Sequence, residues 1–151
     1  MKVYVDVSCL DRPFDDQWQQ RIRLETEAVA LLFDPFASGI WRHVSSDMAL
    51  VEIAAMPDRD RQRRVRSLLP GSEDIITLSP AIYRRAESLI ALGFRQADAT
   101  HVAAAEAQGA DVLLTCDDKL LNRARRRRRR LAVEVENPVI WMRSHEDAAD
   151  P

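Results

Sequence analysis

A short apolar stretch that ends abruptly in acidic residues constrains this chain more than any other feature. Residues 112–121 read Val-Leu-Leu-Thr-Cys-Asp-Asp-Lys-Leu-Leu, an apolar run followed by a hydroxyl, two carboxylates and a helix-like segment. Such a run is typical of a buried strand. The chain opens in the same way, because the β-prone residues 2–5 stop at Asp6, with Ser8 two residues later. Ligands of open α/β sheets bind outside the carboxyl ends of the strands, so we expect both acidic ends to face one crevice and to form a metal site.

The order of the remaining segments predicts an α/β fold. Helical patterns are expected at about 17–33, 45–55, 58–69, 79–92, 96–108 and after 117, and further strands at 40–44, 75–78 and 133–135. Strands that alternate with helices indicate a parallel sheet with helical crossovers. A length of 151 residues fits one domain. We expect this domain over residues 1–140, followed by a C-terminal tail over 141–151.

The overall charge is nearly balanced, and the sequence shows no membrane signal. Acidic residues total 24 against 22 lysines and arginines, so the net charge of -2 argues neither for nor against nucleic acid. The opening Met-Lys-Val-Tyr-Val-Asp meets an acid before any hydrophobic signal region develops. No apolar run approaches the ~18 residues that a membrane-spanning helix needs. We therefore expect a cytoplasmic protein without a membrane segment.

Four carboxylates stand at predicted boundaries between strands and helices. They are Asp6 after the first strand, Glu52 in the helix after the second, Asp98 in the first turn of the alanine-rich helix, and Asp117. Any one of them alone could cap a helix or lie on the surface. Together they would repel one another at a cost of several kcal/mol unless a cation relieves the repulsion. Mg²⁺ prefers oxygen ligands and often binds substrate phosphates as well, so a four-acid pocket suits phosphodiester chemistry.

The acids lie in stretches that resemble a known family. The stretches are Tyr4-Val-Asp-Val-Ser-Cys-Leu-Asp-Arg-Pro-Phe-Asp-Asp16, Ser46-Asp-Met-Ala-Leu-Val-Glu52, Ala97-Asp-Ala-Thr-His101 and Gly109-Ala-Asp-Val-Leu-Leu-Thr-Cys-Asp-Asp118. Their order and spacing, over roughly residues 2–140, resemble the PIN-domain nucleases, particularly the VapC-like toxins of prokaryotic toxin-antitoxin pairs.

The resemblance implies a fold, an activity and partners. The expected fold is a three-layer α/β/α sandwich around a central parallel sheet. The expected activity is Mg²⁺- or Mn²⁺-dependent RNA cleavage, with the catalytic and metal-binding roles carried over to Asp6, Glu52, Asp98 and Asp117. The resemblance also implies a homodimer and a cognate antitoxin whose tail can reach the active-site crevice.

Neighbouring hydroxyls are expected to support the acids. Val7 stands where such proteins often carry a second hydroxyl, which leaves Ser8 to orient the Asp6 carboxylate as a hydrogen-bond donor. The Thr-x-Asp spacing of the family favours Asp117 over Asp118 as the fourth acid, with Thr115 as a supporting hydroxyl. Asp118 is then expected to cap the following helix.

A histidine and two cysteines near the acids leave alternatives open. His101 lies three positions after Asp98 on one helix, so both side chains share a face. It could contact substrate or assist proton transfer, or it could be a packed residue satisfied by a backbone carbonyl. Cys9 and Cys116 match no disulfide framework or zinc pattern, and we expect small buried residues. A redox-sensitive role would require an exposed thiol with a lowered pKa.

The densest charge in the chain is the arginine-rich run over residues 123–130. Arginine binds phosphate bidentately, so four of these residues are expected to contact the RNA backbone: Arg123, Arg125, Arg126 and Arg127. A second basic group consists of Arg59, Arg61, Arg63, Arg64 and Arg66. The chain has 20 arginines and two lysines, so arginine could also simply fill exposed positions. An acidic partner is an equal alternative to RNA as the ligand of this run.

Three functions compete for this sequence. The leading hypothesis is a metal-dependent endoribonuclease that acts as a toxin, and the presence of all four acids favours it. The alternative is a catalytically inactive PIN-like module that binds RNA or regulates. A phosphotransfer domain is a third hypothesis, but the chain lacks Gly-rich phosphate loops and an Asp-x-Asp after the first strand.

Overall fold

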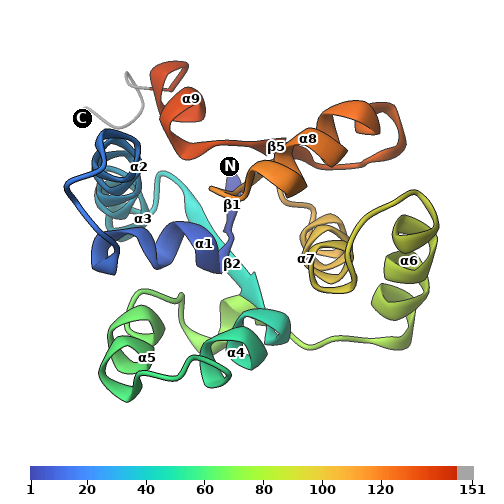
Figure 1. Ribbon diagram of the computed structural model, residues 1–151. Coiled ribbons are helices and arrows are strands. Elements are labelled where there is room, and N and C mark those ends of the chain that lie inside the picture. Colours follow the sequence, from blue (N-terminus) through green and yellow to red (C-terminus); the bar gives the residue numbers. More distant parts are fainter. Residues whose placement is uncertain (146–151) are drawn as a thin grey trace.

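A central parallel sheet organises the molecule. The computed structural model describes residues 1–145, and within them the sheet has five strands in the order β3-β2-β1-β4-β5, all parallel (Figure 1). The strands are β1 (Lys2–Val5), β2 (Arg42–Ser46), β3 (Ile75–Ile76), β4 (Val112–Leu114) and β5 (Glu134–Glu136). The two strands that were expected to end in acids, β1 and β4, are direct neighbours. The predicted α/β class is confirmed.

Helices cover both faces of the sheet. One face carries α1 (Val7–Leu10), α2 (Gln20–Ala30), α3 (Phe33–Ser38), α4 (Asp47–Ala54), α5 (Arg59–Arg66) and α9 (Pro138–Arg143). The other face carries α6 (Pro80–Ala91), α7 (Gln96–Ala107) and α8 (Asp118–Arg126). Short 3-10 turns are η1 (Arg12–Phe14), η2 (Ser72–Asp74) and η3 (Arg128–Arg130). This arrangement is the expected α/β/α sandwich. No helix within residues 1–145 is long and apolar enough to cross a membrane.

The central strands feed two separate cores. Val3 and Val5 of β1 pack into the core under α1 and α2, whereas Tyr4 between them packs against α6 and α7. Strand β4 alternates in the same way, with Leu113 on the side of Tyr4. Because both faces are covered, these strands consist of apolar runs rather than of alternating polar and apolar residues.

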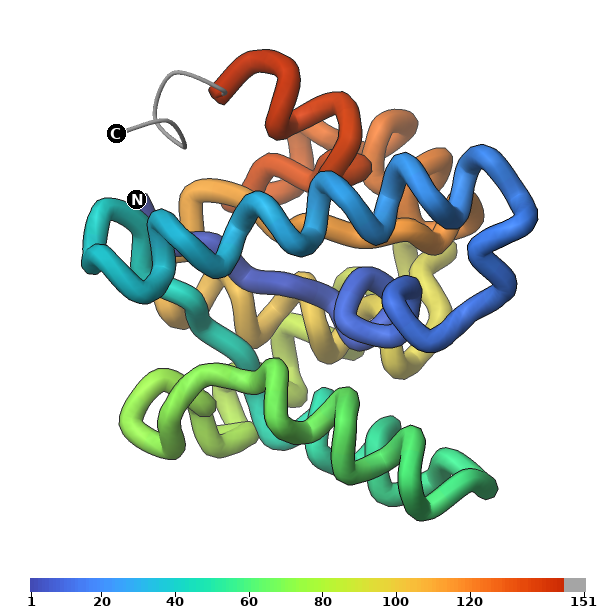
Figure 2. Tube along the Cα trace, turned by 90° about the vertical axis from the view of Figure 1, so that its left-hand side faces the viewer, coloured from blue at the N-terminus to red at the C-terminus, as the bar shows by residue number. Residues whose placement is uncertain are grey.

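The sheet places the start of several helices at one edge. In Figure 2, β1 runs from the N-terminus toward α1, and the chain then turns so that α2 begins on the same side of the molecule. The carboxyl ends of β1 and β4 meet at this edge, because Val5 pairs with Leu114. The residues that follow these two positions are therefore brought together.

The helix expected over 17–33 is two helices. Helix α2 starts at Gln20 and ends at Ala30, and Phe33 opens the separate helix α3. Pro35 was expected to end the helix but lies in the first turn of α3, where a missing backbone N–H is tolerated. Gly39 ends the helical region as expected, in the left-handed conformation with φ 78°.

Other boundaries move by one or two residues. Strand β2 begins at Arg42 instead of residue 40, and His43, which interrupts the apolar pattern, is buried inside it by stacking on Phe36 at 4.6 Å. Strand β3 is shorter than expected, and β5 begins one residue later. Helix α9 contains residue 141, where the expected tail begins, and its Trp141 and Met142 are buried. Residues 146–151 of that tail lie outside the described part of the chain.

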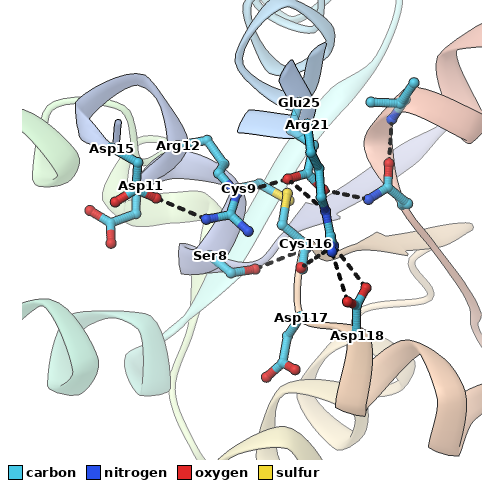
Figure 3. A network of polar contacts seen from close by, with 12 residues as sticks. Ser8, Cys9, Asp11, Arg12, Asp15, Arg21, Glu25, Cys116, Asp117 and Asp118 are labelled. Atoms are coloured by element: carbon cyan, nitrogen blue, oxygen red, sulfur yellow. Dashed lines mark hydrogen bonds and ion pairs between the residues drawn. The ribbon is translucent and has the colours of Figure 1, made fainter. Parts of the chain in front are cut away.

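A line of alternating charges joins α5, η1, α2 and α8. Its members in order are Asp11, Arg61, Asp15, Arg12, Glu25, Arg21 and Asp118. The buried centre is Glu25, with 1% of its side chain exposed, which accepts hydrogen bonds from Arg12 at 2.9 Å and from the Asn137 amide at 2.7 Å (Figure 3). Asn137 caps α9, so this carboxylate also ties α9 to α2. We call these seven residues the charge network.

We predict that Glu25→Ala lowers the free energy of unfolding by about 3 kcal/mol. Removing one partner of a buried ion pair leaves the Arg12 guanidinium and the Asn137 amide without their acceptor. Urea denaturation of the purified protein measures the change. The matched control is Glu27→Ala on the same helix, because Glu27 is exposed and makes no side-chain contact within residues 1–145. We expect a control effect within about 0.5 kcal/mol, and equal effects of the two variants would contradict the assigned role.

Candidate metal centre

Asp6 is the buried acid at the centre of the site. It follows β1, and its backbone N–H donates to the Leu114 carbonyl at 2.9 Å, which continues the β1–β4 pairing. Its Oδ2 accepts hydrogen bonds from Ser8 Oγ at 2.7 Å and from Thr115 Oγ1 at 2.8 Å. Both hydroxyl contacts agree with the roles expected for Ser8 and Thr115. The other oxygen, Oδ1, remains directed at the remaining groups of the site.

The same two hydroxyls organise the loop after β4. Ser8 Oγ accepts from the backbone N–H of Cys116 at 3.0 Å, and Thr115 Oγ1 accepts from that of Asp117 at 3.1 Å. Asp117 is the N-cap of α8, since its Oδ1 accepts from the Lys119 N–H at 2.9 Å. The hydroxyls thus hold Asp117 close to Asp6.

Asp118 has a different role from the one expected. It was predicted to cap α8, but Asp117 is the cap and Asp118 is the first helical residue. Both Asp118 carboxylate oxygens accept from the Arg21 guanidinium at 2.7 Å, and Figure 3 shows the Asp117 carboxylate apart from this pair. The prediction failed because Arg21 is distant in the sequence and its pairing could not be foreseen.

His101 is fully buried between two of the acids. Its Nε2 bonds to Glu52 Oε1 and lies 3.6 Å from Asp6 Oδ1, while its Nδ1 bonds to Tyr4 OH at 2.6 Å. The Tyr4 hydroxyl also bonds to Ser46 Oγ at 2.7 Å. His101 is therefore a packed residue, which was one of the two alternatives expected from the sequence. Its hydrogen-bond partners, however, are side chains of the site and not a backbone carbonyl.

Burial and charge act in opposite directions on His101. Burial alone would lower its pKa, but Tyr4, the hydrogen bond with Glu52 and the charge of Asp6 together raise the pKa well above its ordinary value. Without a metal ion, this shift favours a protonated His101 between Asp6 and Glu52. Metal binding at such a site is expected to release protons.

Asp98 is the acid left without a partner. It lies in the first turn of α7, and its Oδ2 is buried with no hydrogen bond within residues 1–145. Burial, followed by repulsion from Asp6 and Asp117, raises the pKa of Asp98 to about 6. A buried acceptor that faces two other carboxylates marks the point where positive charge is lacking.

Two of the four predicted acids, Asp6 and Glu52, come together with His101 at this edge of the sheet. Ligand atoms of Asp6, Glu52 and His101 lie within 4.8 Å of one another, so these three residues could hold a metal ion. Asp98 and Asp117 are outside this group of three, but the charges of Asp6 and Asp117 contribute to the raised pKa of Asp98. Sequence reasoning missed Tyr4, although a tyrosine inside a buried strand signals a hydroxyl that needs a partner.

The arginine run lies away from the acids. Arg123, Arg125 and Arg126 occupy the last turn of α8, whereas Asp117 caps its first turn, about 13 Å away for a nine-residue helix. Arg125 pairs with Glu136 at 3.4 Å, and Arg127 donates to the Leu92 carbonyl at 3.2 Å. Arg126 and residues 128–130 are exposed. Arg123 is half-buried with its Nη1 atom buried, so the exposed arginines form a basic surface at the end of α8 opposite Asp117.

The two cysteines are buried, as expected. Cys9 and Cys116 come from α1 and the loop after β4, and their sulfur atoms lie 3.5 Å apart. Burial, with a smaller contribution from the contact with Cys116, raises the pKa of Cys9 well above its ordinary value. A protonated, buried thiol is a packing residue rather than a reactive group.

Comparisons with known proteins add no assignment. No protein-family model matches the chain, and no curated protein matches it. What the site can do must therefore be argued from its own geometry.

We predict that the metal-free wild type loses stability between pH 4 and pH 7 when it is compared with Asp98→Asn. The measured quantity is the difference in the free energy of unfolding between the two proteins at each pH. The folded-state pKa of about 6 exceeds the ordinary value of 3.8. The folded protein thus holds this proton more tightly than the unfolded chain, and stability falls as pH rises through this interval. Partial solvent screening limits the expected loss to about 1 kcal/mol. Urea denaturation in chelator at both pH values measures it, and a pH-independent difference between wild type and Asp98→Asn would contradict the prediction.

Proposed function

We propose that this protein is a metal-dependent endoribonuclease, the toxin of a toxin-antitoxin pair, that hydrolyses RNA phosphodiester bonds. The observation that carries the proposal is the convergence of Asp6, Glu52 and His101 within 4.8 Å, bordered by two further carboxylates. Such a concentration of acids is costly unless a cation offsets it. Phosphodiester hydrolysis is a reaction in which clustered carboxylates and divalent cations act together.

The donor set fits Mg²⁺ or Mn²⁺. It consists mainly of carboxylate oxygens, which suit both ions, together with one imidazole nitrogen of His101. The unpartnered Oδ2 of Asp98 is a buried acceptor that a cation would satisfy. Asp6, Glu52, Asp98 and Asp117 would hold the ion. When bound, it would activate a water and neutralise the charge that develops on the phosphate.

Other residues of the chain position the acids. Ser8 and Thr115 fix Asp6 through one carboxylate oxygen and leave the other available. His101 fixes Glu52, and Tyr4 fixes His101. These contacts hold the acids in place before substrate arrives.

The arginine run supports RNA as the substrate class. We propose that Arg123, Arg125, Arg126 and Arg127 contact phosphates of the strand beyond the cleaved bond, since they lie at the far end of α8 from Asp117. The resemblance to VapC-like toxins further suggests a homodimer, a cognate antitoxin and a cytoplasmic setting.

We predict that the purified protein cuts total cellular RNA into discrete fragments in Mg²⁺ or Mn²⁺. Chelator should abolish cleavage, and Asp98→Asn should slow it by roughly 10²-fold or more, because an acid of the cluster is lost. The matched control is Asp34→Asn, an exposed acid of α3 without a side-chain contact within residues 1–145. Gel electrophoresis of the RNA measures cleavage, and Mn²⁺ titration measures metal binding by each variant. Intact RNA together with Mn²⁺ binding that differs between wild type and Asp98→Asn would favour the inactive RNA-binding module.

We also predict that the arginine run contributes to salt-dependent RNA binding. Each phosphate contact adds about 0.7 to the slope of log affinity against log salt for single strands. The double variant Arg125→Gln/Arg126→Gln should therefore reduce the slope by about 1.4. The control with equal charge change is Arg59→Gln/Arg66→Gln on α5. Equal slopes for both double variants would show that net charge, rather than this surface, determines binding.

A further inference from the structure

A groove leads away from the acidic edge between α2, α8 and the start of α9. Its volume is about 540 Å³, within the range of small-ligand sites. It begins at Asp118, the residue after Asp117, and extends along α8 to Arg125. Seven residues of helix span about 10 Å. The groove therefore starts at the residue that follows Asp117 and ends at the cation of Arg125.

The walls of the groove present apolar surface to solvent. Leu24 of α2 and Ile140 of α9 line it and are 41% and 45% exposed. Leu121 of α8 is buried beneath them. Half-exposed aliphatic side chains of this kind would be covered by the flat face of a nucleobase.

Two unused amides accompany this apolar surface. Gln20 on α2 and Asn122 on α8 line opposite walls, and both are exposed. Neither side chain makes a hydrogen bond within residues 1–145, whereas Asn137 donates to Glu25 and accepts from Val139. A primary amide offers two donors and one acceptor, which match the hydrogen-bonding edge of an unpaired base.

The negative charges in the groove are neutralised by ion pairs, so they would not repel the phosphates of an RNA strand. Its two carboxylates, Glu25 and Asp118, are both paired with Arg21 through the charge network (Figure 3). Arg21 also donates to the Cys116 carbonyl at 3.2 Å, which fixes the groove to the loop that carries Asp117. Arg125 at the far end is 54% exposed and only loosely paired with Glu136 at 3.4 Å. It is available to a phosphate.

We propose that this groove is a subsite for one unpaired nucleotide of the RNA strand, adjacent to the bond cleaved at the metal centre. The proposal rests on the nuclease function proposed above. The base lies between Leu24 and Ile140, Gln20 and Asn122 bond to its edge, and the following phosphate approaches Arg125. The subsite makes cleavage depend on the base next to the cut.

Binding of short RNA in chelator tests the subsite without cleavage. The probes are fluorescein-labelled tetranucleotides carrying each of the four bases and an abasic tetramer of the same charge, followed by anisotropy. We expect at least one base-containing probe to bind roughly tenfold more tightly than the abasic one. Gln20→Ala and Asn122→Ala should each weaken that probe about five- to tenfold, as the loss of one hydrogen bond predicts, and leave the abasic probe unchanged. The control is Gln19→Ala, an exposed amide next to the groove without a capping hydrogen bond.

Other outcomes separate this proposal from the nuclease. Equal binding of abasic and base-containing probes, or unchanged binding by both amide variants, would overturn the subsite even if RNA is cut in Mn²⁺. A base preference that depends on Gln20 and Asn122 would support the subsite even if RNA stays intact. Light scattering tests whether a second copy occupies the groove. A dimer that Ile140→Glu converts to a monomer with unchanged probe binding would also overturn the proposal.

Discussion

The parallel pairing of β1 with β4 determines where nearly every group of the site lies. Val5 pairs with Leu114, so Asp6 and Thr115 leave the sheet side by side and share a hydrogen bond. The buried apolar residues of the two strands hold this pairing from both faces. Hydrophobic burial in the sheet thus offsets the repulsion among carboxylates that gather at its edge.

Negative charge at this edge is balanced unevenly. Two hydroxyls stabilise Asp6, His101 bonds to Glu52, and Arg21 neutralises Asp118. Among the predicted acids, only Asp98 keeps a buried oxygen without a hydrogen-bond partner within residues 1–145. Asp6, Glu52 and Asp118 thus have hydrogen-bond or ion-pair partners. Negative charge remains unbalanced at Asp98, where a cation would bind. Asp118 is adjacent to Asp117, but its ion pair with Arg21 gives it a structural role.

The parallel sheet and the acids that follow its strands could be predicted from the sequence. Contacts between the faces of helices that are distant in the sequence could not. Apolar runs that end near Asp6 and Asp117 predicted neighbouring strands. A strand that is buried on both faces consists of consecutive apolar residues, so such runs are recognisable in the sequence. Glu25 looked like one more helical charge, since its partners Arg12 and Asn137 are known only once η1, α2 and α9 are packed. Strand β2 was misplaced because stacking of His43 on Phe36 buries a residue that the pattern treats as polar.

The wide sequence separation inside the site has a consequence for synthesis. Asp6 and the Thr115 hydroxyl that holds it are 109 positions apart. A ribosome adding about 5–20 residues per second needs roughly 5–20 s to make the chain between them. During that time β1 can pair with β2 but lacks β4, and Asp6 has neither Thr115 nor the loop that carries Asp117. The site can form only after residue 117 has been made, so a shorter nascent chain carries the first acid but not the assembled centre.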